Sequence, residues 1–215
     1  MHANYLKITL VLLLGLALGP AAGCLPGGGR HAPADKHYYL VATPRPAPAA
    51  PAPAGPVSDA TLRLRRFRVS PDYSGRELVY RMGETDVTSD FYNVFFTPPA
   101  DMFTQGLRQW LQDADLCAHV VEDASLARSG LVLEPVLNAL YGDFAGSAPE
   151  AVVRMQFFLV DDAGRGGEIV FAKDYERRAP LAARNAEALV EGYRQAVAGI
   201  YAALEADLRG ALAGR

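Results

Sequence analysis

Cys24 is the residue with the clearest chemistry, because it ends an apolar leader through a step of small residues. The leader runs over Ile8–Leu18 after Lys7, and Ala21–Gly23 precedes the cysteine. An apolar stretch this short cannot cross a hydrocarbon core, which needs about 20 residues, so the pattern indicates an export signal. A thiol in this setting accepts diacylglycerol, and cleavage then makes it the new N-terminus. We expect residues 1–23 to be a lipoprotein signal peptide and Cys24 to be the site of lipidation.

Two residues beside the cysteine refine this expectation. Ala21 stands where lipoprotein signals usually carry Leu, so ordinary signal cleavage, which would release a free periplasmic protein, stays open as an alternative. Leu25 stands where the signal for inner-membrane retention places Asp. Several acyl chains on one cysteine hold a membrane better than the marginal binding of a single chain. We therefore expect a stable anchor on the periplasmic face of the outer membrane of a Gram-negative envelope.

The rest of the chain offers few groups for catalysis. His119 is the one histidine of the expected folded body, since His31 and His37 belong to the N-terminal segment. Cys117 lies two positions before His119 on an expected strand, where thiol and imidazole could share a face and act as a nucleophile pair. No motif frames them, so we expect a buried, inert Cys117 and no catalytic residue. A periplasmic hydrolase that uses this pair is the less favoured alternative.

Metal, nucleotide and nucleic-acid sites are not indicated either. Asp161-Asp162 is typical of a turn, and Asp113 with Asp115 of a fraying helix end. The run Gly164–Gly167 lacks the following helix that a phosphate-binding loop needs. The net charge is −3, whereas nucleic-acid binding requires a basic excess. We expect no metal, no cofactor and no nucleic-acid partner.

The N-terminal segment, residues 24–58, is dominated by proline and alanine. The run over 44–53 cannot build a helix or a ladder and favours extended polyproline conformation. One apolar island, Tyr38–Val41, interrupts this composition, and we predict that it forms a short first strand. The segment is thus expected to be a tether with one strand docked on the domain and the Pro/Ala run looping away after it.

Residues 59–215 are expected to form a single α+β domain. The fold class predicted is a two-layer sandwich, with a mostly antiparallel sheet and two amphipathic helices packed on one face. The first helix should begin at Thr97 as capping residue and the second should cover about 28 residues from Ala186. Strands are expected over 61–69 with a phase shift between Leu64 and Phe67, then over 77–81, 86–96, 118–121, 131–141 with Pro135 as an interruption or edge, 151–160 and 168–177.

The last helix is long enough to extend past a small sheet. An overhang would present Leu204, Leu208 and Leu212 to a partner, and a homo-oligomer is compatible with such a face. The alternative, which we favour, is that these leucines belong to the core.

The pattern of the mature chain resembles the ABC-type transport auxiliary lipoprotein family, which is associated with MCE-domain proteins. The resemblance rests on the leader with Cys24, on Tyr38–Leu40, on the stretch Tyr92–Leu111 and on the alternating strand Val152–Asp162. It implies a non-enzymatic docking component of envelope lipid transport. The partners it implies are an MCE-domain protein and the complex of an ABC permease with its ATPase.

The docking surface can be predicted at the residue level. An aromatic contact with an arginine rim is a common interface chemistry. We expect the exposed share of Tyr92, Phe95 and Phe96 to bind the partner, guided by the arginine row Arg63, Arg65, Arg66 and Arg68. One alternative concerns these residues: the aromatic side chains belong to the core and the arginines form a solvated strand face. Another concerns the function: the protein is a lipoprotein activator of a cell-wall synthase.

Overall fold

The computed structural model describes residues 35–47, 55–164 and 166–213, in which one sheet carries two long helices. The strands are β1 (His37–Tyr39), β2 (Ser58–Leu64), β3 (Arg68–Val69), β4 (Glu77–Arg81), β5 (Val87–Phe95), β6 (Cys117–Glu122), β7 (Leu131–Asp143), β8 (Glu150–Asp161) and β9 (Glu168–Pro180). The helices are α2 (Pro99–Asp113) and α3 (Ala186–Leu212), and a 3-10 turn, η1, covers Pro71–Tyr73.

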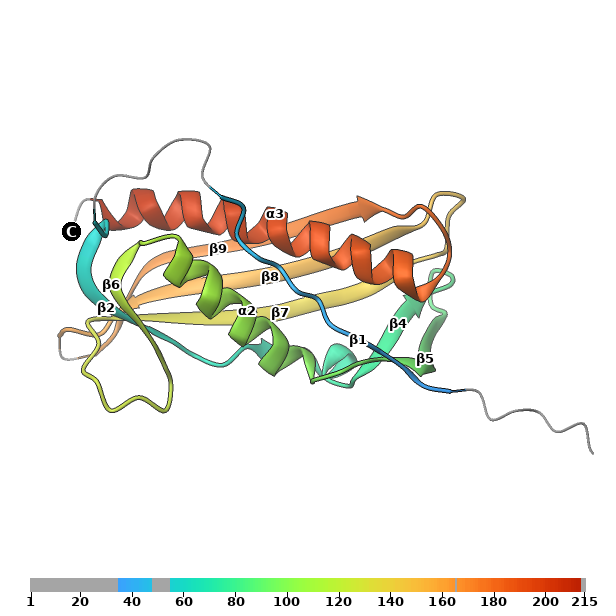
Figure 1. Ribbon diagram of the computed structural model, residues 1–215, viewed down its shortest axis with the longest axis horizontal. Coiled ribbons are helices and arrows are strands. Elements are labelled where there is room, and N and C mark those ends of the chain that lie inside the picture. The colour runs from blue at the N-terminus through green and yellow to red at the C-terminus, as the bar shows by residue number, and fades with distance from the viewer. Residues whose placement is uncertain (1–34, 48–54, 165, 214–215) are drawn as a thin grey trace, which may run out of the picture. The chain divides into compact units, whose positions relative to one another are not determined.

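The sheet is built around β7. On one side, β7, β8 and β9 follow each other as long antiparallel neighbours. On the other side, β2, β3 and β4 pair in turn with successive parts of β7, each in parallel. β6 extends the sheet beyond β2, whereas β5 and then β1 extend it beyond β4. This side of the sheet therefore ends in two separate wings, β2–β6 and β4–β5–β1 (Figure 1).

Pro135 does not interrupt β7; of the two predicted roles it takes the edge position, because the lost donor falls where no partner strand needs it. The carbonyls of Leu133 and Leu137 accept from the amides of Arg65 and Ser70, so alternate residues of β7 face β2 and β3. The missing N–H of Pro135 points the same way, into the gap between those two strands. There the chain leaves the sheet and the Phe67 amide donates to the Thr104 hydroxyl at 2.9 Å. The phase shift predicted between Leu64 and Phe67 is this gap.

Alternation along β8 decides which face of the sheet is covered. Arg154 is exposed and Gln156 half-buried on one face. The other face is fully buried, and it consists of Ala151, Val153, Met155, Phe157 and Leu159. Both helices lie on one side of the sheet (Figure 1). The predicted fold class is confirmed, and the sheet is mostly antiparallel because its long ladders are antiparallel while the parallel pairs are short.

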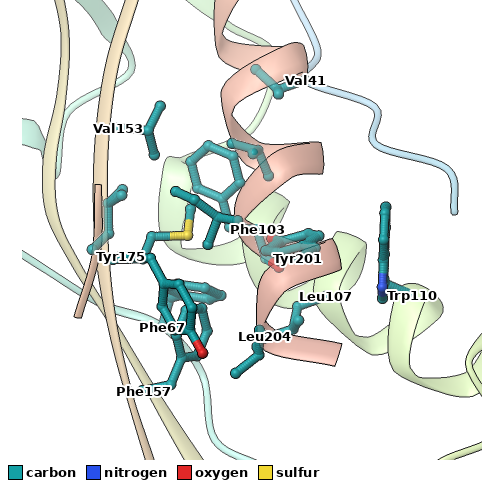
Figure 2. Close-up of a cluster of buried hydrophobic side chains, with 14 of the residues drawn as sticks. Val41, Phe67, Phe103, Leu107, Trp110, Val153, Phe157, Tyr175, Tyr201 and Leu204 are labelled. Atoms are coloured by element: carbon teal, nitrogen blue, oxygen red, sulfur yellow. Dashed lines mark hydrogen bonds between the residues drawn. The ribbon is translucent and has the colours of Figure 1, made fainter. Parts of the chain in front are cut away.

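The core fills the space between the sheet and the helices. Figure 2 shows its centre, where Phe157 of β8 meets Phe67 and Tyr175 edge-on at ring separations of 6.0 and 5.7 Å. Trp110 of α2 and Tyr201 of α3 join the two helices in the same way, at 5.6 Å. The favoured prediction for the last leucines of α3 is confirmed, and they form no overhang, since all three are buried in this core: Leu204, Leu208 and Leu212.

The two helices begin differently. The Asn185 side chain accepts a hydrogen bond from the Ala188 amide at 2.9 Å, which caps α3. The predicted capping role of Thr97 is wrong, because Pro98 occupies the N-cap position of α2 and no side chain caps it. Pro99 at the first helical position needs no cap for its own nitrogen, because proline has no N–H to satisfy.

The chain that follows β1 is bound to the helix layer as a strap, which we define as residues 40–47. It alternates between inward and outward positions, so that Val41 and Thr43 are buried. The Val41 amide lies 3.3 Å from the Met102 sulfur, and Arg45 pairs with Glu205 at 2.7 Å. Figure 1 shows the strap crossing between α2 and α3. The predicted first strand, Tyr38–Val41, is shorter and begins one residue earlier, because the chain turns from the sheet to the helices after Tyr39.

Candidate functional site

The predicted lipidation site lies outside the described residues. Cys24 and the signal peptide over 1–23 both precede Asp35, where the described chain begins. In the described residues, no helix is long and apolar enough to cross a membrane. What the structure places is the point at which a chain from Cys24 enters the domain, immediately before β1.

The predicted aromatic contact residues divide between the surface and the core. Tyr92 and Phe96 are 46% and 59% exposed, whereas Phe95 is 2% exposed. The Phe95 ring turns inward against Tyr193 of α3, with the ring centres 6.2 Å apart. Successive residues of a strand point to opposite faces, which sends Phe95 and Phe96 in opposite directions.

Four exposed aromatic residues lie on β1, on β5 and directly after β5: Tyr38, Phe91, Tyr92 and Phe96. We call this cluster the aromatic edge. Tyr38 meets Phe96 edge-on at 6.3 Å, and Phe91 meets Tyr92 in the same manner at 5.3 Å. Tyr38 is 55% exposed and Phe91 is 62% exposed. Tyr38 and Phe91 lie on predicted strands, but neither was predicted to be a contact residue. A usable signal was present, because adjacent Phe91 and Tyr92 cannot both face the core from a regular strand.

Two cations lie against these rings. The Lys36 ammonium is 3.9 Å from the centre of the Phe91 ring, and the Arg76 guanidinium is 5.6 Å from that of Tyr38. Such cation–π contacts contribute about 0.5–1 kcal/mol at exposed sites. Arg76 is also fixed by a hydrogen bond to the carbonyl of Phe95 at 2.8 Å. The aromatic edge therefore combines apolar rings with positive charge.

Asp90 of β5 is held by hydrogen bonds from neighbouring residues. Its carboxylate accepts from the Tyr80 hydroxyl at 3.1 Å, from the Tyr92 amide at 2.9 Å, and from both the amide and the side chain of Asn93. Burial acts to raise the pKa of Asp90, but the hydrogen bonds from Asn93, Tyr92 and Tyr80 outweigh it and lower the pKa. Asp90 thus stays ionised while its oxygens are directed to local donors.

The arginine row lies on β2, on β3 and in the gap between them, and it is largely engaged in local structure. Arg63 donates to carbonyls of the loop after β6, including those of Ser125 and Ala127. Arg65 pairs with Asp123 at 2.8 Å, and Arg66 pairs with Asp101 at 2.6 Å. Arg68 is exposed on β3 and lines shallow surface hollows beside Glu134 and Pro135. In strand order β4 and β7 separate β5 from β2, so the structure does not bring these arginines to the aromatic edge.

Cys117 and His119 are placed in different environments. Cys117 is buried, as predicted, and burial raises the pKa of its thiol to about 11. His119 is exposed on the same strand. Among the described residues, no group of three or more His, Cys, Asp or Glu side chains is arranged to hold a metal ion. The Cys117–His119 pair therefore lacks the activated thiolate that nucleophilic catalysis needs.

Comparison with known proteins gives the fold a set of structural neighbours. No family model and no curated protein matches the chain. The protein XCC0632 from Xanthomonas campestris, described as a member of family DUF330, shares 18% identity over 78% of this chain and 90% of its own, with a TM-score of 0.64. A protein described only as uncharacterised shares 13% identity over 81% of this chain and 99% of its own, with a TM-score of 0.63. The hypothetical protein CT253 from Chlamydia trachomatis has a TM-score of 0.52 at 8% identity, over 73% of this chain and 99% of its own.

These findings correct the family resemblance drawn from the sequence. The likeness to ABC-type transport auxiliary lipoproteins is overturned, because no family model matches and the similar structures are described as DUF330 and uncharacterised proteins. At these identities the neighbours share the fold alone. The resemblance rested on a pattern of strands and helices, and such a pattern belongs to a fold more than to a family.

Proposed function

We propose that the protein is a lipid-anchored, non-enzymatic docking component of an envelope transport system, and that the aromatic edge is one of its contact surfaces. The observation that carries this proposal is the exposure of four aromatic rings on β1 and β5, beside the point where the chain enters the domain. Large apolar rings that the core does not need are typical of contact surfaces. The leader and Cys24 support the anchor, because an apolar stretch that ends at a cysteine fits lipoprotein processing.

The titratable groups of the domain support a binding role over catalysis. Several of the ion pairs join elements of the fold, such as Arg66 of the β2–β3 gap to Asp101 of α2, and Lys173 of β9 to Asp207 of α3. Buried Cys117 lies away from solvent, and His119 has no hydrogen-bonded partner among the described side chains that would make it a base. In the proposed function the domain therefore binds partners through its surface, while the lipid anchors it to the membrane.

The anchor is tested by labelling cells with a fatty acid. Labelled palmitate should appear on the exported protein and should be absent from the Cys24→Ala variant, and the label should fractionate with the outer membrane. A wild-type protein that carries no label, or that is released as a free periplasmic protein, contradicts the anchor.

The docking role is tested by crosslinking in cells. Photoreactive residues would replace Thr88 on β5 beside the aromatic edge, Arg154 on the open face of the sheet and Gln195 on α3, all of which are exposed. Capture of a permease, an ATPase or an MCE-domain protein supports the transport role. Capture of a cell-wall synthase would instead select the activator alternative, and substrate turnover by the purified protein would refute the non-enzymatic role.

A further inference from the structure

We infer that the aromatic edge binds the interfacial layer of the same membrane that carries the lipid on Cys24. The inference rests on the lipid anchor of the proposed function, and it names the membrane as what the aromatic edge contacts. The domain would then touch the membrane at two points, one covalent and one through Tyr38, Phe91, Tyr92 and Phe96.

The length of chain between the anchor and the aromatic edge carries the first step. Asp35, where the described chain begins, follows Cys24 by 11 positions. Fully extended, this stretch spans at most about 40 Å. After Asp35 the chain is held on the domain, first by β1 and then by the strap, where Arg45 is paired with Glu205. These segments therefore add no length to the tether. A tether this short keeps the membrane at a high effective concentration next to the aromatic edge.

The chemistry of the rings carries the second step. Tyrosine has an apolar body and a polar tip, and it is enriched where bilayer hydrocarbon meets water. Tyr38 and Tyr92 can place their rings among the upper acyl chains and keep their hydroxyls at the headgroups, while Phe91 and Phe96 add apolar area. Leu40, the first residue of the strap, is 57% exposed and follows β1 directly.

The charges at the aromatic edge fit this occupant. Lys36 and Arg76 lie against the rings, where long cationic side chains can reach anionic headgroups while their stems stay among apolar groups. Asp35 and Glu77 are exposed near these cations, whereas two other acids are engaged by local donors. Asp90 is bound by Tyr80, Tyr92 and Asn93, as described above. Glu187 accepts the Tyr39 hydroxyl at 2.9 Å.

A second contact gives the anchored domain an orientation. A lipid alone leaves the domain free to rotate about its tether, whereas two separate contacts restrict it. With the aromatic edge on the membrane, the open face of the sheet remains available to protein partners. This assigns the membrane to β1 and β5 and leaves transport partners to the other faces.

The test uses the full mature lipidated protein in vesicles of phosphatidylethanolamine and phosphatidylglycerol. Ser89→Cys places an environment-sensitive fluorophore on β5 without removing any of the four aromatic residues. Ala172→Cys on β9 is the matched control, since both positions are exposed strand residues. Cys117 is buried and should take no label. Nitroxide-bearing lipids should quench the fluorophore at position 89, leave position 172 unquenched, and lose their effect at 89 when Phe91→Ser and Phe96→Ser are combined.

The outcomes separate this inference from the proposed function. If the lipidated protein floats with the vesicles but position 89 stays unquenched, the aromatic edge does not bind the membrane, while the anchor and the docking role still stand. Equal quenching at 89 and 172 also overturns the inference, because it shows no preferred orientation. If the mature protein carries no lipid and does not float, the anchor itself fails and the inference fails with it. Thermal unfolding of the double variant checks that it remains folded.

Discussion

The centre of the sheet and its β1–β5 edge both contain paired aromatic rings, yet only those at the edge face solvent. Phe157 in the centre and Phe96 at the edge each make an edge-on ring contact near 6 Å. Phe157 is fully buried because α3 packs over β8 and β9, whereas Phe96 is 59% exposed. The comparison teaches that the covering layer, and not the ring contact, separates a core aromatic residue from a contact residue.

Matched truncations should give the largest contrast. Phe157→Ala leaves a cavity under α3 and should lower the free energy of unfolding by about 3–5 kcal/mol. Phe96→Ala removes a ring that already faces water, so the loss should stay within about 1 kcal/mol. Urea unfolding followed by circular dichroism measures both. Similar losses at the two positions would show that the aromatic edge is structural and would weaken its role as a contact surface.

Two glycines of α3 make a second comparison. A Cβ on Gly192 would meet Leu181 at 2.5 Å and the Ala151 Cβ at 2.7 Å, whereas a Cβ on Gly210 meets nothing within 4 Å. Gly192→Ala should therefore destabilise the protein by about 1–3 kcal/mol. Gly210→Ala should stabilise it by up to about 1 kcal/mol through helix propensity. Equal effects of both changes on the melting temperature would mean that α3 is not seated on β8 as described.

The interaction that Glu205 makes with the strap should stabilise the protein at neutral pH and be lost in acid. Glu205 accepts from Arg45, Trp110 and Arg209, and Glu205→Gln should cost about 1.5–3 kcal/mol at pH 7. The hydrogen bond from Arg45 outweighs burial and lowers the pKa of Glu205 below its ordinary 4.5. The stabilisation is therefore complete above pH 4.5 and is lost as the pH falls through the lowered pKa. The stability difference between wild type and variant should shrink in acid, and a difference that is constant down to pH 3 would contradict this role of the carboxylate.

The last comparison is between the reactivity of a buried thiol and that of an exposed thiol, and it involves no change in the free energy of unfolding. Burial raises the pKa of Cys117 to about 11, so iodoacetamide at pH 8 should modify it only after unfolding. The introduced thiol of Ser89→Cys at the edge should react at once in the folded protein. Mass spectrometry after short exposure distinguishes the two, and rapid labelling of native Cys117 would show that β6 is open to solvent.

The sequence predicted the regular elements well because they carry strong local periodicity. The alternation of β8 and the apolar face of α3 can be recognised without knowledge of any partner segment. The division of one β7 edge among β2, β3 and β4 could not be recognised, since it depends on pairings between segments far apart in the chain. The capping role assigned to Thr97 failed for a local reason, the two prolines that follow it.

The candidate site was only partly predictable. Composition identified an aromatic strand, but not the register shift between Glu77 and Leu78 of β4, which leaves residues 91–93 of β5 without a partner on β4. The arginine row looked free in the sequence, because its partners Asp101 and Asp123 lie 35 and 58 positions away. The strap was hidden by its Pro/Ala composition, in which the alternating Val41, Thr43 and Arg45 give a weak signal.

Hydrogen exchange of the lipidated protein, with and without vesicles, tests the central claim most directly because it observes both regions at once. The account predicts that vesicles slow exchange in the peptides that contain Lys36–Tyr39 and Phe91–Phe96, while exchange in β8 and α3 stays as it was. Unchanged exchange at β1 and β5 on vesicles that hold the protein by its lipid, or slowing spread evenly over the domain, would contradict it.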